Sequence, residues 1–244
     1  MPNRRQILAC LSLGWAGTLA TPTAAAQVPS LKDPEPGPGA GPGWRHQTLP
    51  KVERANDFEI VPDDGRRALR VRSSSSASSW VAGVDIDPAR LPVLRWRWKV
   101  SRSLAGSDLN NKSGDDYAAR LYVFFDLPVD RLSLADRLRI QAARLLSGAE
   151  IPAAALCYVW GHDQPVGTSA WNPYTDRVRM IVVDSGDAHA KQWRSVSRDV
   201  RQDWANAFGG TMPRVSGVGV GADTDNTGDS VEAWFSDLTF AEGP

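Results

Sequence analysis

Hydrophobic and polar residues alternate along most of the chain from residue 58 to residue 240. The clearest stretch is residues 94–100, Leu-Arg-Trp-Arg-Trp-Lys-Val, in which apolar and basic side chains must point to opposite faces of a β-strand. About nine such segments at modest spacing predict an all-β sandwich or barrel, and of these we expect a jelly-roll-like β-sandwich. The other segments are residues 58–61, 68–72, 80–86, 117–126, 156–160, 178–183, 215–220 and 231–240.

Two segments have a helical pattern and predict one or two short helices inserted between the strands. In residues 133–147 the apolar side chains recur at helical spacing, with Ser133 as the N-cap and Gly148 just beyond the end. The other face of this segment is rich in arginine, which would suit a membrane surface, but a helix packed on the sandwich is the favoured interpretation. Residues 199–208, followed by two glycines, predict the second helix.

The first 26 residues predict a signal peptide, because Arg4 and Arg5 precede a short apolar run and small residues then lead to Ala26. Ordinary secretion and twin-arginine export both stay open. Residues 27–43 are rich in Pro and Gly and predict a disordered linker, so we expect a single β-sandwich domain over residues 44–244. The predicted signal peptide leads us to expect a periplasmic or secreted protein, and no apolar segment is long enough for a transmembrane helix.

Charge and cysteine content exclude several classes of function. The first 26 residues contain two arginines and no acidic residue, which leaves 26 basic and 28 acidic side chains and gives no support for nucleic-acid binding. Without the leader only Cys157 remains, so the mature domain has no internal disulfide. The chain also contains 10 tryptophans, which favours a domain that stacks aromatic rings on a flat ligand such as a sugar.

The densest group of polar residues lies where residues 112–116 lead into the apolar strand at 117–126. A charge such as that of Arg120 within an apolar strand must be paired or exposed to water. A face of Arg, Tyr and Asp side chains suits a ligand platform, and cross-strand ion pairs explain it equally well. The candidate ligand-binding residues are Arg97, Lys112, Asp115, Asp116, Arg120, Tyr122, Trp160, Asn172 and Arg179.

Residues 223–229, Asp-Thr-Asp-Asn-Thr-Gly-Asp, are the candidate metal site. Oxygen-bearing side chains at alternate positions and a Gly at the sixth match the start of a calcium loop, which makes calcium the candidate cofactor. The twelfth position is Trp234 and not Glu, so the loop is not an EF-hand, and a polar hairpin loop is the alternative interpretation. The candidate ligands are Asp223, Asp225, Thr227 and Asp229.

Several motifs together resemble an exported bacterial family known as "domain of unknown function 3047". The resemblance runs from about Trp44 to Phe240 and implies membership of a family without an assigned reaction. Typical members carry Asn where this chain has Cys157, which argues against a chemical role for the cysteine. The motifs are residues 94–100, 112–120, 158–160, 172–174, 223–228 and 234–240.

We expect the domain to bind an oligosaccharide or another polar polymer of the cell envelope, with aromatic rings stacking on sugars and Arg, Asp and Asn binding hydroxyls. One alternative is a glycan-cleaving hydrolase or lyase that uses the same cleft, with a carboxylate pair from distant loops such as Asp116 and Asp225. Another alternative is a structural envelope protein that docks a second protein. The chain has no G-x-S-x-G motif, dinucleotide-binding motif or phosphate-binding P-loop, so nucleophilic and nucleotide chemistry have little support.

Overall fold

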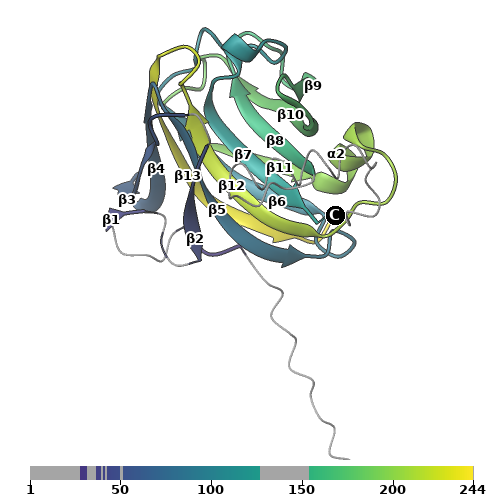
Figure 1. Cartoon of the computed structure of the whole chain (residues 1–244). Helices are drawn as coiled ribbons and strands as arrows, with labels where there is room; N and C mark the ends of the chain where they lie inside the picture. Colours follow the sequence, from purple (N-terminus) through teal and green to yellow (C-terminus); the bar gives the residue numbers. More distant parts are fainter. Residues whose placement is uncertain are drawn as a thin grey trace, which may run out of the picture.

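Two β-sheets stacked face to face form the described part of the chain (Figure 1). The computed structural model describes residues 28–31, 37–39, 41, 43–49, 52–126 and 154–243. The first sheet has six strands in the order β1-β3-β4-β13-β6-β11. These strands are β1 (Gly37–Pro38), β3 (Asp57–Asp63), β4 (Arg66–Ser74), β13 (Ser230–Ala241), β6 (Val93–Val100) and β11 (Arg194–Asp199).

The second sheet has seven strands in the order β2-β5-β12-β7-β8-β10-β9. Strands β8 and β10 run parallel to each other, and the other pairings in the described residues are antiparallel. These strands are β2 (Trp44–Thr48), β5 (Ala77–Ile86), β12 (Val215–Asp223), β7 (Tyr117–Phe125), β8 (Ala154–Gly161), β10 (Thr175–Ser185) and β9 (Ser169–Asn172).

The architecture confirms the predicted all-β sandwich, and all nine predicted strands are present. The second predicted helix is α2 (Val200–Ala207), which begins at Asp199 because the Asp199 carboxylate accepts hydrogen bonds from the backbone N–H groups of Arg201 and Gln202. A short 3₁₀ turn, η1 (Lys112–Gly114), precedes β7. The helix predicted at residues 133–147 lies outside the described residues.

Aromatic side chains from both sheets fill the space between them. Trp96 and Trp98 of β6 face Tyr158 and Trp160 of β8, with ring centroids 5.2 Å apart for Trp96 and Tyr158 and 5.8 Å apart for Trp98 and Trp160. All four rings are almost completely buried. At ~25 cal/mol per Å² of apolar area, each such ring stabilises the fold by several kcal/mol. The alternation of β6 therefore directs its tryptophans into the core and its arginines outward.

Residues 27–43 are predicted to be a disordered linker, but those of them that the structure describes pack partly against the sandwich. Val28 and Leu31 are buried in the main hydrophobic core, and the indole N–H of Trp44 donates to the carbonyl of Pro29 over 3.1 Å. Strand β1 pairs with β3, so part of the Pro/Gly-rich segment lies against the sandwich. The predicted signal peptide lies outside the described residues. In the residues that the structure covers, none of the helices has the length and hydrophobicity to cross a membrane.

Candidate functional site

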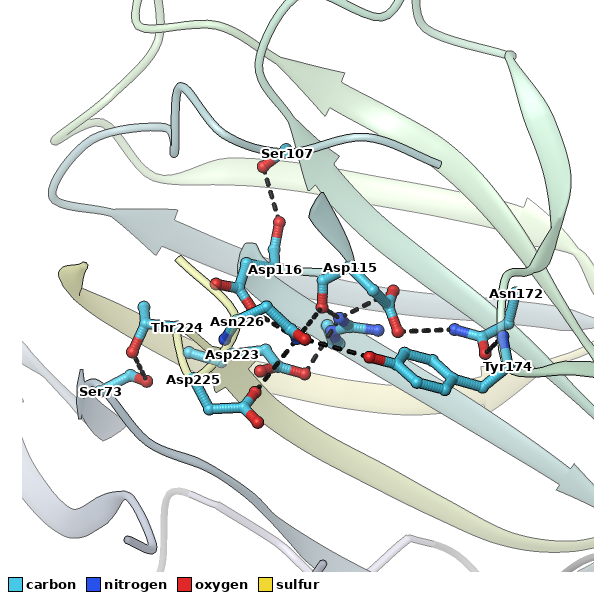
Figure 2. A network of polar contacts seen from close by, with 12 residues as sticks. Ser73, Ser107, Asp115, Asp116, Asn172, Tyr174, Asp223, Thr224, Asp225 and Asn226 are labelled. Carbon is cyan, nitrogen blue, oxygen red and sulfur yellow. Dashed lines mark hydrogen bonds and ion pairs between the residues drawn. The ribbon is translucent and has the colours of Figure 1, made fainter. Parts of the chain in front are cut away.

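Three polar segments converge on the outer face of the seven-stranded sheet (Figure 2). They are η1 with the entry to β7, the turn between β9 and β10, and the loop that follows β12. Beneath them a second, smaller hydrophobic cluster covers this face of the sheet, with Cys157 and Val159 of β8 and Met180 and Val182 of β10 at its centre. The inward-facing residues of β7 and β8 belong to the main core. The second cluster therefore lies on the opposite, outer face of the same sheet, beneath the three polar segments.

Arg120 is the buried centre of the site. One guanidinium nitrogen lies 3.1 Å from the Asp115 carboxylate and 3.0 Å from the Asp223 carboxylate, and it also donates to the backbone carbonyl of Asp115. The guanidinium also stacks 4.8 Å above the ring of Tyr117. Burial opposes the positive charge, but the neighbouring carboxylates hold the pKa of Arg120 above its usual value. Arg120 is therefore charged and paired inside the sheet face, as its position in an apolar strand requires.

A chain of hydrogen bonds runs outward from Arg120 to an exposed tyrosine. The amide of Asn172 donates to the second oxygen of the Asp115 carboxylate over 2.9 Å. The side-chain oxygen of Asn172 accepts from the backbone N–H of Tyr174. The single proton of the Tyr174 hydroxyl is directed to the side-chain oxygen of Asn226 at 3.0 Å, and the carbonyl of Lys112 lies 3.3 Å away as a second acceptor. The Tyr174 residue is nevertheless 56% exposed. The hydroxyl end of the ring is thus fixed while more than half of the residue stays exposed, with the Lys112 ammonium 5.1 Å from the ring centre.

Asp116 anchors the loop after β12. Its carboxylate accepts two hydrogen bonds from Asn226, at 3.3 and 3.0 Å, and two from Thr227, at 2.7 and 2.6 Å. A carboxylate has about four lone-pair sites, so these donors use the full capacity of Asp116. The residue is completely buried. Asp116 therefore holds the loop in place and has no free oxygen lone pair for a ligand.

The predicted calcium ligands do not form one group in the described residues. The carboxylates of Asp116, Asp223 and Asp225 lie within 4.8 Å of one another, which brings two of the four predicted ligands together with Asp116. Thr227 instead donates to Asp116, and Asp229 forms an ion pair with Arg102. Calcium takes about six to eight oxygen ligands, and this group offers few because Asp116 is saturated and Asp223 is paired with Arg120.

Asp223 is the member of this group whose negative charge is least well stabilised. One of its oxygens lies 3.0 Å from Arg120, and the other is buried and has no hydrogen-bond partner. Burial, and then the neighbouring carboxylates of Asp225 and Asp116, raise the pKa of Asp223 well above its usual value against the opposing effect of Arg120. The buried thiol of Cys157 lies beside the same cluster, and burial raises its pKa to about 12, so it is a neutral filler at physiological pH.

Two aromatic rings extend the site along β7. The rings of Tyr122 and Phe124 lie nearly parallel, with centroids 5.7 Å apart and planes 12° apart. A Cβ atom at Gly217 or Gly219 of β12 would come within 3.3 Å of the Phe124 ring, so these glycines make room for it. Both rings are half-buried. The outer face therefore offers partly exposed aromatic surface beside the polar network.

The structure brings six of the nine predicted ligand-binding residues together: Lys112, Asp115, Asp116, Arg120, Tyr122 and Asn172. Trp160 is fully buried between the sheets and cannot stack on a ligand. Arg97 lies on the outer face of the other sheet, because β6 belongs to that sheet. Arg179 lies on the opposite face of its sheet from Asn172, where it stacks on Trp171 at 5.1 Å.

Two site residues were missed from the sequence, namely Tyr174 and Asn226. Both lie within motifs that carried the family resemblance, but in turns, where alternation says nothing about direction. An exposed aromatic residue in a polar turn was the available signal for Tyr174. With them, the site holds four carboxylates and two cations, which makes its net charge negative when all are ionised: Asp115, Asp116, Asp223 and Asp225 against Lys112 and Arg120.

A family model described as "Protein of unknown function (DUF3047)" matches residues 42–239, which include the site and, apart from β1 and the last two residues of β13, the strands of both sheets. The chain belongs to this family. The match confirms the resemblance drawn from the motifs of the sequence, and it assigns no reaction. No curated protein matches the sequence.

Solved structures of similar architecture include proteins that bind or cleave glycans. The family 30 carbohydrate-binding module of the cellulase CEL9D-CEL44B from Clostridium thermocellum has a TM-score of 0.37 and 13% identity, over 88% of this chain and 97% of the module. The xyloglucanase domain of NopAA from Sinorhizobium fredii has a TM-score of 0.44 and 9% identity, over 85% and 98%. The endoglucanase cel12A from Rhodothermus marinus has a TM-score of 0.41 and 9% identity, over 86% and 99%. Similarity at this level is one of fold and carries no argument about the ligand.

Proposed function

We propose that the domain binds a neutral oligosaccharide, or a neutral segment of an envelope polymer, on the outer face of the seven-stranded sheet at Tyr174. The observation that carries this proposal is the Tyr174 ring, which is 56% exposed while its hydroxyl is held by Asn226 and the carbonyl of Lys112. An exposed ring whose hydroxyl is already held loses little conformational entropy when a sugar stacks on it. An exposed tyrosine without such anchoring would be an ordinary surface residue.

The groups around the ring suit sugar hydroxyls. Lys112, Asp225 and Asn226 are exposed beside Tyr174, and the Lys112 ammonium lies 5.1 Å from the centre of its ring. Ammonium, carboxylate and amide groups can donate to and accept from hydroxyl groups. The net negative charge of the site disfavours acidic sugars there, because the exposed Asp225 carboxylate would repel a carboxylate or sulfate group. A neutral glycan is therefore the favoured ligand.

Binding without cleavage is favoured over the glycosidase alternative. A glycoside hydrolase needs two carboxyl groups that reach the scissile bond. Asp116 is completely buried and accepts four hydrogen bonds, and Asp223 is buried against Arg120. Asp225 is left as the exposed carboxylate of this group. The predicted signal peptide stays a prediction, and export would give the domain access to envelope glycans.

The test is a binding measurement with Tyr174→Ala on the full chain. Isothermal titration calorimetry would use cellohexaose, xylohexaose and chitohexaose as neutral probes. We expect at least one probe to bind, and its affinity to fall by about tenfold or more in Tyr174→Ala, because the stacking face is removed. Trp171→Ala is the matched control, since Trp171 is also an exposed aromatic residue near the β9–β10 turn but lies on the other face of β9. The affinity of Trp171→Ala for the neutral probes should match that of the wild type.

Equal loss of affinity in both variants would point to a general effect of the turn and contradict a stacking role for Tyr174. Failure of all three neutral probes to bind the wild type would contradict the proposal itself. Release of shorter sugars from a bound probe would instead support the glycosidase alternative.

A further inference from the structure

A cavity of about 340 Å³ lies on the outer face of the six-stranded sheet, remote from the site at Tyr174. Its volume lies at the lower end of the ~300–1,000 Å³ range of small-molecule sites. Strands β6, β11 and β13 form its walls, and β11 is the edge of the sheet. The lining residues are Arg95, Trp96, Arg97, Ser195, Val196, Ser197, Asp237 and Thr239.

Strand register surrounds the two arginines of this cavity with hydroxyl groups. Arg95 is paired with Ser197 of β11 on one side and with Thr239 of β13 on the other, and Arg97 is paired with Ser195. Directly opposite residues in an antiparallel pair point to the same face. The cavity thus combines two guanidinium groups, which bind planar anions, with hydroxyl groups that can donate and accept.

The arginines of this cavity have spare positive charge. Arg95 is exposed, and among the described residues no carboxylate forms an ion pair with it. The Arg97 guanidinium lies 3.9 Å from the Asp237 carboxylate, which also contacts Arg66 at 3.5 Å. Arg97 in addition lies 5.2 Å above the ring of Trp193, which restricts its orientation. An anion entering the cavity would therefore find donors that are already positioned.

Two other described cavities lack this property. A cavity of about 370 Å³ contains Arg72 and Arg102, but Arg72 pairs with Glu232 at 2.9 Å and Arg102 pairs with Asp229. The other has only about 90 Å³; its Arg198 pairs with Asp203, and its Arg179 donates to Ser169 and stacks on Trp171. Ion pairs of this kind satisfy the guanidinium groups internally. Of these three cavities, the one at Arg95 combines a volume suited to a small molecule with an arginine that forms no ion pair in the described residues.

A β-bulge at Asp237 shapes the wall of this cavity. Asp237 has a φ of 58°, which is uncommon for a residue other than Gly, and the pairing of β13 with β6 shifts between Ser236 and Thr239. Such bulges redirect side chains and are found next to binding sites. Here the bulge turns the Asp237 carboxylate toward Arg97, and Thr239 still lies opposite Arg95.

We propose that this cavity is a second binding site, and that it takes a sugar unit carrying a carboxylate or a sulfate group. The anionic group would bind Arg95 and Arg97, and the ring hydroxyls would bind the Ser195, Ser197 and Thr239 side chains. Its positive charge makes it complementary to acidic sugars, whereas the negative site at Tyr174 suits neutral ones. The two sites lie on different sheets, so this inference does not depend on the neutral-glycan site.

The test measures binding of trigalacturonic acid and of a sulfated galactotriose to the full chain, with unmodified galactotriose as the neutral probe. We expect at least one acidic probe to bind, and galactotriose to bind at least about tenfold more weakly. Arg95→Gln should weaken acidic binding by about tenfold or more, because it removes a charge-assisted donor pair. The affinity of Arg95→Lys for the acidic probes should lie between those of the wild type and Arg95→Gln, since lysine keeps the charge and loses the planar geometry.

Arg45→Gln is the matched control, because Arg45 is an exposed arginine on β2 of the other sheet. Its acidic-probe affinity should equal that of the wild type. Arg95 is exposed, so its substitution leaves the core intact, and an unchanged melting temperature would confirm this. Equal affinity of both acidic probes for wild type and Arg95→Gln would overturn the proposal, and so would a wild type that binds neither acidic probe.

Discussion

Asp223 shows how one buried side chain can make the stability of the site depend on pH. It is an acidic group with one oxygen paired to Arg120 and the other without a hydrogen-bond partner, beside the carboxylates of Asp116 and Asp225. Its pKa is raised by burial, so the folded state binds a proton at this position more tightly than the unfolded chain does. The stabilising contribution of this group is therefore complete at low pH and declines as the pH rises.

Asp223→Asn should reduce this pH dependence. In the wild type the contribution is fully present below about pH 4, the pKa of an unfolded aspartate, and is lost as the pH rises through the raised pKa of the folded state. Asparagine keeps an oxygen for Arg120 and has no titrating proton. Urea unfolding from pH 4 to pH 8 should therefore show the variant gaining stability relative to the wild type as the pH increases.

Asp225→Asn is the control for this prediction, because Asp225 belongs to the same group but is exposed. It should change the slope of stability against pH less than Asp223→Asn does. A constant difference between Asp223→Asn and the wild type across the whole pH range would show that Asp223 does not titrate in this window.

At the scale of single residues, alternation predicted some positions of the site and could not predict others. Alternation over residues 117–126 puts Arg120 and Tyr122 on one face of the strand, and in β7 the two side chains do lie together. It could not orient Trp160, because every residue of β8 is buried and both faces of that strand are apolar. Arg97 was grouped with Arg120 because alternation within a strand does not say which sheet the strand joins.

At the scale of elements, strand β12 combines alternate glycines with a crowded outer face. A Cβ atom at Gly221 would lie 2.5 Å from the backbone carbonyl of Ser78, and one at Gly219 would lie 3.1 Å from Val81. Backbone atoms cannot move away as a flexible side chain can. These glycines therefore allow β12 to lie close to β5 and to the aromatic rings of β7.

Gly221→Ala should destabilise the protein by about 1–3 kcal/mol, since the added methyl group forces the backbones of β12 and β5 apart. Gly83→Ala is the matched control, because Gly83 is also a strand glycine and a Cβ atom there would meet no atom within 4 Å. Its effect should be neutral or slightly stabilising, by up to about 1 kcal/mol. Thermal unfolding of Gly221→Ala and Gly83→Ala measures the two changes in stability. Equal melting temperatures would mean that the β5–β12 contact is looser than the structure shows.

The strands of the described residues that the sequence did not predict share one position in the fold. Strands β1, β2, β9 and β11 are the outermost strands of the two sheets. They are short, with two, five, four and six residues, and most residues of β2, β9 and β11 are exposed or half-buried. Edge strands of this kind avoid continuous apolar faces, since an apolar edge would promote aggregation. Hydrophobic alternation is therefore weakest at the sheet edges, while the central strands were all predicted.

At the scale of the whole molecule, the two outer faces of the sandwich have different chemistry. One carries the negative network around Arg120 and Tyr174, and the other carries the arginines of the Arg95 cavity. The long-range pairing of strands decides this distribution, for example by joining β12 to β7 and β13 to β6. Local pattern could predict the sandwich but not which polar residues share a face, because sheet order depends on contacts far apart in the sequence.

The folded domain begins before residue 44. The composition of residues 27–43 predicts a spacer, yet Leu31 is 2% exposed within the main core and Val28 packs in the same core. Leu31→Ala in the full chain should therefore lower the free energy of unfolding by about 2–5 kcal/mol, because it removes a buried side chain and leaves a cavity. A spacer would show almost no change. Leu49→Ala is the control, since Leu49 is 42% exposed and its loss should cost little. Equal urea midpoints for Leu31→Ala and Leu49→Ala would mean that the folded domain begins nearer residue 44.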